Sequence, residues 1–190
     1  ITSIDQLDLS KKYSYANYLK WQLEEYVELI RGKVFRMSPG PNRKHQQVST
    51  MLLHFLLPKV VDGPCEIYHA PFDVRLLSTN DHDTFTVVQP DVCIICDPSK
   101  LDDKGCVGAP DLVVEILSPY TSQKDLGDKY DLYEEAGVKE YWVVDPVHAR
   151  LDQYVLNQGK FTLLKAHIAR DQIQSSIFPD IHGDLEGIFK

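Results

Sequence analysis

The feature that most constrains this chain is a carboxylate inside an apolar segment. Glu115 lies within residues 111–118, surrounded by Leu, Val and Ile, and Asp91 follows Pro90 in a second apolar segment, residues 87–92. A charged carboxylate in apolar surroundings is costly unless a cation or hydrogen bonds compensate it. The pattern therefore predicts two buried strands whose carboxylates share a divalent metal. The alternative is a pair of rim carboxylates, each paired with a basic side chain.

The composition is that of an ordinary globular chain. Its 190 residues are 43% hydrophobic and 25% charged, which suffices for a core of its own, and we expect a single domain over residues 1–190. The sequence contains no apolar run near the roughly 18 residues of a membrane span, and its first residues lack a signal-peptide pattern. We therefore expect a cytoplasmic protein.

The four cysteines agree with that expectation. Cys93 and Cys96 have the spacing of half a zinc site, but residues three apart on a strand point to opposite faces, and no second pair follows. We therefore expect buried free thiols, as is usual in a reducing compartment.

The charge distribution argues against loose attraction to nucleic acid. The net charge is -8, whereas binding of that kind depends on Lys and Arg that neutralise phosphates. A local exception is the basic stretch, residues 31–45, which contains no Asp or Glu and centres on residues 38–42. Its basic side chains are Arg31, Lys33, Arg36, Arg43 and Lys44. They predict either a DNA-contacting patch or an ordinary solvated turn.

Hydrophobic periodicity predicts the order of the elements. We expect a short helix at 13–23, a hairpin at 26–37, a helix at 42–61 capped by Asn42, strands at 65–77 and 84–96, a loop at 97–110, a strand at 111–117, a helix at 121–136 whose capping pattern spans 122–125, a strand at 139–145, a hairpin at 149–168, and a tail from 178 that docks as a cap. The order of strand, helix and strand around 111–145 predicts a right-handed parallel crossover.

Several motifs follow one another along the chain. They are Glu28, His45, Gln89-Pro90-Asp91, the segment 110–119, Asp125-x-x-x-Lys129, Tyr133 and the segment 137–146. Their order resembles the bacterial Uma-two family, over about residues 15–189. The resemblance implies an α/β (α+β), restriction-endonuclease-like fold of the PD-(D/E)XK type, with a mixed central sheet flanked by helices. Together with the hairpin at 149–168, this gives the fold we expect. The resemblance also implies a homodimer in many members and a magnesium-dependent nuclease site.

The chemistry of the residues agrees with that resemblance. Hard cations held by carboxylates on neighbouring strands catalyse phosphodiester hydrolysis, so we expect Asp91 and Glu115 to bind Mg²⁺ or Mn²⁺, with the Ile116 carbonyl as a further ligand. In the usual signature a lysine stands two residues after the acidic residue, where this chain has Leu117. Lys129 on the following helix is the expected substitute. Alternatively, it pairs with Asp125 on the helix surface.

Two further residues complete the expected catalytic set. Glu28 is either another metal ligand or an outward-facing edge charge, and His45 either contacts a phosphate or a bound water or is a capping or surface residue. We therefore expect a metal-dependent endonuclease acting on DNA. The rival hypothesis is a catalytically silent nucleic-acid- or protein-binding module on the same fold. Ser118 lacks a GxSxG context, which argues against a serine hydrolase.

Overall fold

The computed structural model describes residues 1–37, 42–77, 80–118 and 123–190, the side chains of 123–125 excepted. These residues form two six-stranded mixed sheets and one two-stranded sheet. The central sheet has the order β12 (Lys160–Ile168), β11 (Arg150–Asn157), β10 (Glu140–Asp145), β9 (Leu112–Ile116), β6 (Val92–Ile95) and β3 (Glu66–His69). The N-terminal sheet has the order β2 (Lys33–Arg36), β1 (Val27–Ile30), β5 (Thr86–Val88), β4 (Val74–Leu76), β8 (Gly105–Val107) and β7 (Leu101–Asp102). β13 (Gln172–Gln174) pairs with β14 (His182–Asp184).

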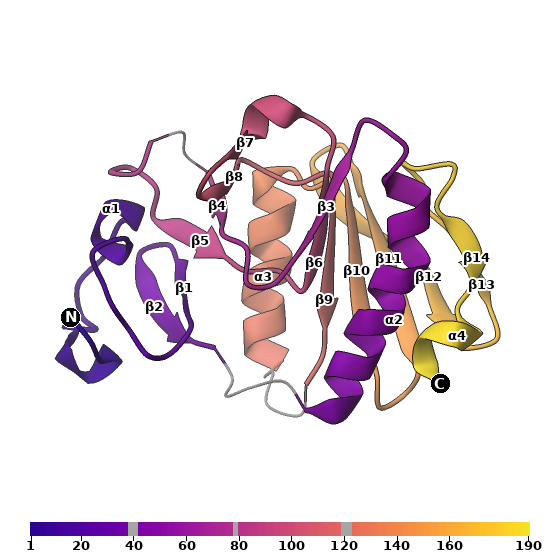
Figure 1. The fold of residues 1–190 in the computed structure, drawn as a ribbon, viewed down its shortest axis with the longest axis horizontal. Helices are drawn as coiled ribbons and strands as arrows, with labels where there is room; N and C mark the ends of the chain where they lie inside the picture. Colours follow the sequence, from indigo (N-terminus) through magenta and orange to yellow (C-terminus); the bar gives the residue numbers. More distant parts are fainter. Residues whose placement is uncertain (38–41, 78–79, 119–122) are drawn as a thin grey trace.

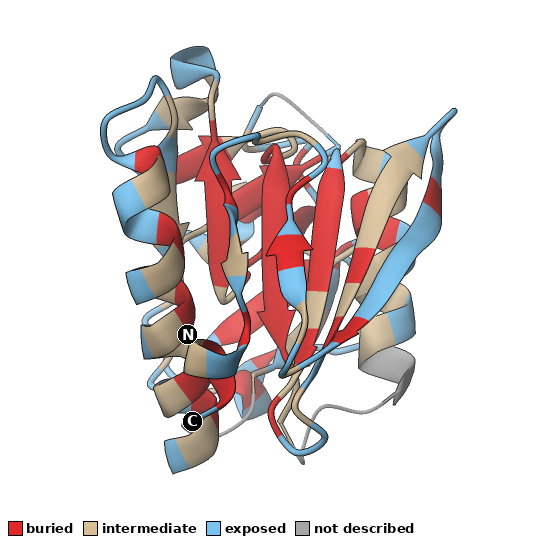
Figure 2. Cartoon of the chain, turned by 90° about the vertical axis from the view of Figure 1, so that its right-hand side faces the viewer, coloured by how far each residue is buried: buried red, intermediate tan, exposed pale blue. Residues whose placement is uncertain are grey.

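Two long helices lie on opposite sides of the central sheet (Figure 1). The helices of the described residues are α1 (Tyr15–Tyr18), α2 (Arg43–Val60), α3 (Gln123–Ala136) and α4 (Glu186–Phe189), with short 3₁₀ turns η1 (Ile4–Gln6) and η2 (Pro98–Lys100). Leu52 of α2 belongs to the same core cluster as Val114, whereas Leu132 of α3 clusters with Val113. Adjacent residues of β9 therefore pack into two hydrophobic cores, one on each face of the sheet. The central strands are buried on both faces (Figure 2). In the described part of the chain, no helix is both long and apolar enough to cross a membrane.

Several predicted elements are confirmed. β1 and β2 form the expected hairpin, and their turn uses Arg31 and Gly32 with φ of 52° and 82°. The Asn42 side chain caps α2 by accepting a 2.9 Å hydrogen bond from the backbone N–H of His45. β9 and β10 are parallel, on either side of α3 in the sequence, and β11 and β12 form the C-terminal hairpin. The capping pattern expected at 122–125 cannot be compared, because residue 122 and the side chains of 123–125 lie outside the described part of the structure.

The segments 65–77 and 84–96 each cross from one sheet to the other. The first contains β3 of the central sheet and β4 of the N-terminal sheet, and the second contains β5 and β6 in the opposite order. Pro71 and Pro90 lie at the two crossings, where a residue without a backbone N–H interrupts strand pairing. The crossings bring the two sheets together just before Asp91.

Two local predictions were wrong in extent. The helix expected at 13–23 is reduced to α1, because Tyr15 and Tyr18 turn inward and donate hydrogen bonds to Asp73 at 3.0 and 3.5 Å. The expected loop 97–110 contains the β7–β8 hairpin. At Gly105, φ is +130° and a Cβ would lie 2.2 Å from the Asp73 carbonyl oxygen, so only glycine allows this close approach.

The cysteine prediction was half right. Cys93 and Cys106 are buried free thiols, whereas Cys65 and Cys96 form a disulfide. Glu66 faces Ile95 in the β3–β6 ladder, so the next pair outward places Cys65 opposite Cys96. The sequence did not reveal that register.

The C-terminal segment docks as expected. Ile181, Leu185, Ile188 and Phe189 are buried in the core cluster that lies under α2. Figure 1 shows α4 beside α2, near the C-terminal end of the chain. The segment therefore closes the α2 side of the central sheet.

Candidate active site

Glu115 lies on β9, and Asp91 directly precedes the neighbouring strand β6. β6 and β9 are antiparallel, with Val92 opposite Val114, and one further step in this register pairs Asp91 with Glu115. Directly opposite residues of antiparallel strands project from the same face. The backbone N–H of Ile116 donates a 2.7 Å hydrogen bond to Asp91 Oδ2, which holds this carboxylate next to the Glu115 strand.

Lys129 of α3 contacts this acidic pair from the helix side. Its Nζ lies 3.0 Å from Oε1 of Glu115 and 3.0 Å from Oε1 of Glu28, which belongs to β1. The Lys129 side chain is only 15% exposed, so its ammonium group is not turned to solvent. The predicted alternative, a surface pair with Asp125, involves a side chain outside the described residues.

Glu28 is buried rather than outward-facing. It is 6% exposed, and besides Lys129 it accepts a 2.8 Å hydrogen bond from the backbone N–H of Gln89. The interpretation of Glu28 as an edge charge is therefore wrong. Through this hydrogen bond the Glu28 carboxylate connects β1 of the N-terminal sheet with the segment that crosses to the central sheet just before Asp91.

Tyr133 is part of the cluster, although the sequence suggested no role for it. Its hydroxyl donates a 2.7 Å hydrogen bond to Glu115 Oε1, the same oxygen that Lys129 contacts. Tyr133 follows Lys129 by four residues, which places the two side chains on one face of α3. The spacing of Lys129 and Tyr133 was visible in the sequence, but their shared contact with Glu115 on β9 was not.

The cluster carries more negative than positive charge. Burial raises the pKa of Glu115 to about 7, and repulsion from Asp91 and Glu28 adds to this rise while Lys129 opposes it. Burial disfavours the charged form of Lys129 too, but attraction to Glu115 and Glu28 outweighs it and raises the lysine pKa. Three carboxylates thus share one ammonium group in a partly dehydrated space.

His45 lies beside Asp91 at the start of α2. Its Nε2 is 3.3 Å from Asp91 Oδ1, and the side chain is 11% exposed. Burial lowers the pKa of His45, but the hydrogen bond and charge of Asp91 and the charge of Glu115 reverse the direction, so the pKa is raised overall. The interpretation of His45 as a surface residue is wrong, and its capping contact uses only the backbone.

All five predicted catalytic residues line one cavity of about 590 Å³, the site cavity. They are Glu28, His45, Asp91, Glu115 and Lys129. Ile116 and Leu117 line it as well, so position 117, where the usual lysine is missing, borders the site cavity. The structure brings together residues that are separated by up to about a hundred positions in the sequence.

The donor chemistry of the site cavity fits a hard divalent cation. Asp91 and Glu115 offer carboxylate oxygens. Burial, with repulsion from Asp91 and Glu28, raises the pKa of Glu115, and a bound cation would neutralise the negative charge of these carboxylates. Among the described residues, however, no group of three or more His, Cys, Asp or Glu side chains is arranged as a finished metal site. Two protein carboxylates with water completing the shell is the arrangement that Mg²⁺ often adopts.

The basic stretch is partly neutralised by the chain itself. Arg31 pairs with Glu135 and Arg36 lies 3.2 Å from Glu25, whereas Lys33 donates only to the neutral Ser10 carbonyl. Lys44 donates to the Phe189 carbonyl at 2.9 Å and so keeps its charge unpaired there, and Arg43 is exposed. Residues 38–41, at the centre of the stretch, lie outside the described residues.

The fold of the chain is shared with a solved structure. A crystal structure from Anabaena variabilis ATCC 29413, described as "a putative nuclease belonging to DUF820", superposes with a TM-score of 0.71 over 93% of this chain and 97% of that one, at 19% identity. The likeness confirms the predicted fold class. It concerns the fold alone, since the identity is low.

The sequence defines the family. The Uma2 profile, described as "Putative restriction endonuclease", matches residues 15–186, and the chain therefore belongs to the Uma2 (Uma-two) family. "Uncharacterized protein slr1290" of Synechocystis sp. (strain ATCC 27184 / PCC 6803 / Kazusa) is 28% identical over 166 residues, which cover 86% of this chain and 84% of that protein. The resemblance inferred from the motifs is confirmed.

Proposed function

We propose that this protein is a Mg²⁺- or Mn²⁺-dependent endonuclease that hydrolyses phosphodiester bonds of DNA. The observation that carries the proposal is the convergence in one cavity of Asp91, just before β6, Glu115 of β9 and Lys129 of α3. Two carboxylates on neighbouring strands and one ammonium group are the side chains that phosphodiester hydrolysis needs. The description of the family as "Putative restriction endonuclease" supports DNA as the substrate.

Each residue has a distinct task in this proposal. Asp91 and Glu115 hold the cation, which when bound supplies a Lewis acid and a way to activate water at neutral pH. Lys129 stays protonated, orients Glu115 and Glu28, and offers a fixed positive charge to the negative charge that develops on the phosphate. Tyr133 fixes the Glu115 carboxylate, and His45 does the same for Asp91.

A binding module without turnover is the second candidate. The observation that favours it is the engagement of the Lys129 ammonium group by two carboxylates, with Leu117 at the usual lysine position. A lysine held in this way has less charge to offer a phosphate. The two candidates differ in one measurable property, which is turnover.

We expect the purified protein to cleave plasmid or oligonucleotide DNA only when Mg²⁺ or Mn²⁺ is added. Asp91→Asn and Glu115→Gln keep the side-chain shapes but remove the charges, and each should lower the cleavage rate about 100-fold or more. Asp131→Asn is the matched control, because Asp131 is exposed on α3. DNA binding without cleavage under all metal conditions would support the binding module instead.

We further propose that DNA contacts the basic stretch through its least neutralised side chains. Replacing Arg43 and Lys44 with Ala should flatten the log-log salt dependence of DNA binding by about two units, close to one per lost phosphate contact. Fluorescence anisotropy at a series of salt concentrations measures this slope. Lys160 and Lys165, which lie on β12, provide the matched double substitution. An equal slope for the wild type and the Arg43/Lys44 variant would mark the stretch as solvated surface.

A further inference from the structure

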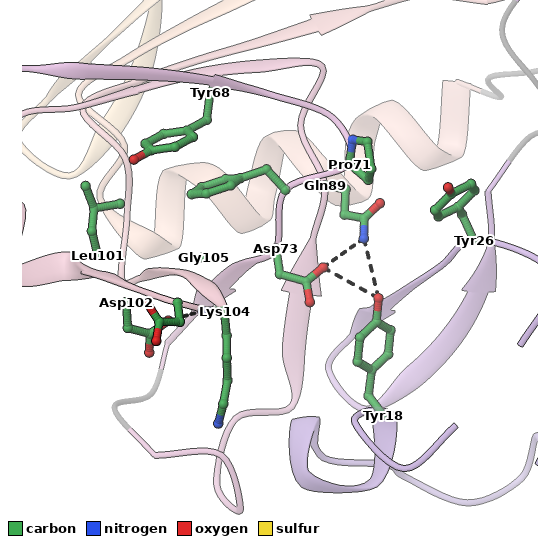
Figure 3. A pocket seen from close by; sticks show the side chains of 12 residues that line it. Tyr18, Tyr26, Tyr68, Pro71, Asp73, Gln89, Leu101, Asp102, Lys104 and Gly105 are labelled. Atoms are coloured by element: carbon green, nitrogen blue, oxygen red, sulfur yellow. Dashed lines mark hydrogen bonds between the residues drawn. The ribbon is translucent and has the colours of Figure 1, made fainter. Parts of the chain in front are cut away.

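A second hollow, the side pocket, adjoins the site cavity and has no part in the proposed chemistry. It measures about 510 Å³, and its walls include Tyr18, Tyr26, Tyr68, Phe72, Asp73 and Gln89 (Figure 3). A volume of this order is typical of pockets that hold small organic groups. The question is which chemical group fits these walls.

The side pocket and the site cavity share a wall. Tyr26, Pro71 and Gln89 line both hollows. The backbone N–H of Gln89 donates to Glu28 in the site cavity, while its side-chain Nε2 donates to Asp73 Oδ1 in the side pocket at 2.8 Å. A polymer with its reacting bond in the site cavity would therefore have a neighbouring group next to the side pocket.

The side pocket has aromatic walls. The rings of Tyr68 and Phe72 stack with centroids 4.2 Å apart and an interplanar angle of 9°. Tyr26 is 64% exposed, although it lines both hollows, so its ring is open to a ligand. Aromatic rings of this kind are the side chains on which nucleobases stack.

The polar groups of the side pocket are mainly acceptors. Asp73 is fixed by hydrogen bonds from Tyr15, Tyr18 and Gln89. The Gln89 side-chain oxygen is buried and has no hydrogen-bond partner among the described residues. Figure 3 shows this oxygen turned away from Asp73, on the side where Tyr26 lies. An unpaired buried acceptor is unfavourable, and a ligand N–H would satisfy it.

The carboxylates of the side pocket exclude the phosphate group of a nucleotide. Asp73, Asp102 and Asp103 line the side pocket, of which Asp102 is paired with Arg75. Lys104 is the single basic side chain among the described lining residues, and it is already paired with Asp81. A phosphate would be repelled there. A planar ring with an N–H edge suits both the acceptors and the aromatic walls.

We propose that the side pocket receives a nucleobase, from a nucleotide neighbouring the scissile phosphodiester, and that Gln89 Oε1 accepts a hydrogen bond from its exocyclic amino group. This inference rests on the proposed function, because it assumes a nucleic acid strand at Asp91 and Glu115. It adds a specificity site, in which bases with an amino group bind better than uracil or thymine. The Tyr26 ring covers the bound base.

The test uses free nucleosides, so that neither metal nor cleavage is needed. Deoxycytidine and deoxyuridine have nearly the same shape, but only deoxycytidine carries an amino group at this edge. Titration followed by amide chemical shifts should show deoxycytidine binding about tenfold more tightly, with shifts at side-pocket residues. Equal binding of the two nucleosides, or no binding of either up to the solubility limit, would overturn the proposal.

Two variants assign the contacts. Tyr26→Ala should weaken deoxycytidine binding about tenfold or more, the scale of losing one stacked base, whereas Phe85→Ala, a 41% exposed aromatic residue that lines neither hollow, should not. Gln89→Met should remove the preference for deoxycytidine over deoxyuridine. If Gln89→Met does not fold, the wild-type comparison and Tyr26→Ala still decide the question.

The outcomes separate this inference from the proposed function. Selective nucleoside binding in a protein that never cleaves DNA would support the side pocket and refute the endonuclease. Metal-dependent cleavage without nucleoside binding would refute the side pocket alone. Binding of Nα-acetyl-arginine amide in place of either nucleoside would assign the side pocket to a protein side chain and overturn the nucleobase proposal.

Discussion

Lys129→Ala is expected to lower DNA cleavage about 100-fold or more, the scale of losing one positioned electrostatic group. The ammonium group of Lys129 lies 3.0 Å from both Glu28 and Glu115, and these two carboxylates have no other cation of the described residues at salt-bridge distance. Single-turnover cleavage at saturating metal measures the loss. Full activity in the variant would show that Lys129 has no role in the chemistry.

The same substitution should also destabilise the fold, and the two effects need separating. Removing one partner of a buried ion pair leaves an uncompensated charge and costs about 3–5 kcal/mol. Urea unfolding measures this cost. Cleavage by the variant and by the wild type is then compared at a temperature at which both proteins are folded. Lys160→Ala is the control, since Lys160 forms its ion pair with Glu134 while 80% exposed, and its removal should have a much smaller effect.

A rescue experiment distinguishes a chemical role from a structural one. Leu117 lines the site cavity with Glu115 and Lys129, so a lysine at this position would place an ammonium group in the same space from another element. Leu117→Lys in the Lys129→Ala background should restore part of the cleavage activity. A variant that regains stability but no activity would show that Lys129 acts at its own position only.

The acidic pair was predictable because it depends on local pattern. Glu115 interrupts an apolar strand, and a buried carboxylate in such a strand needs a partner wherever the strand lies. The pairing of Asp91 with Glu115 then follows from the antiparallel register of β6 and β9. Lys129 was placed by its position on the helix that directly follows β9, supported by the family resemblance.

The parts that sequence reasoning missed depend on contacts between distant segments. Gln89 links Glu28 to Asp73 through a crossing between two sheets. Pro90 marks an interruption of the strand there, but the local sequence does not show that the chain changes sheets. The Cys65–Cys96 disulfide depends on the β3–β6 register. α1 ends early because its tyrosines bond to Asp73, 55 or more residues away, and a single turn of helix has little stability of its own to resist such contacts.

Metal binding should disappear in Asp91→Asn and in Glu115→Gln. Two carboxylates supply most of the protein charge that would hold a hard cation here, and either substitution removes half of it. Isothermal titration with Mn²⁺ at pH 8 measures the affinity, because burial and the neighbouring charges raise the pKa of Glu115 to about 7 and the carboxyl is mostly ionised at the higher pH. Asp131→Asn, on the exposed side of α3, should bind as the wild type does.

Thermal stability provides an independent readout of the same site. A ligand that binds only the folded state stabilises it by about 2.7 kcal/mol at a concentration of 100 Kd, so Mn²⁺ should raise the melting temperature of the wild type and of Asp131→Asn. In Asp91→Asn and Glu115→Gln the rise should vanish, even though Tyr133 still reaches position 115 and Ile116 still donates to position 91. Wild-type affinity and an unchanged rise in both variants would contradict the shared site. The cation would then bind elsewhere, and among the described residues the carboxylates of the site cavity would be balanced by Lys129, His45 and hydrogen bonds.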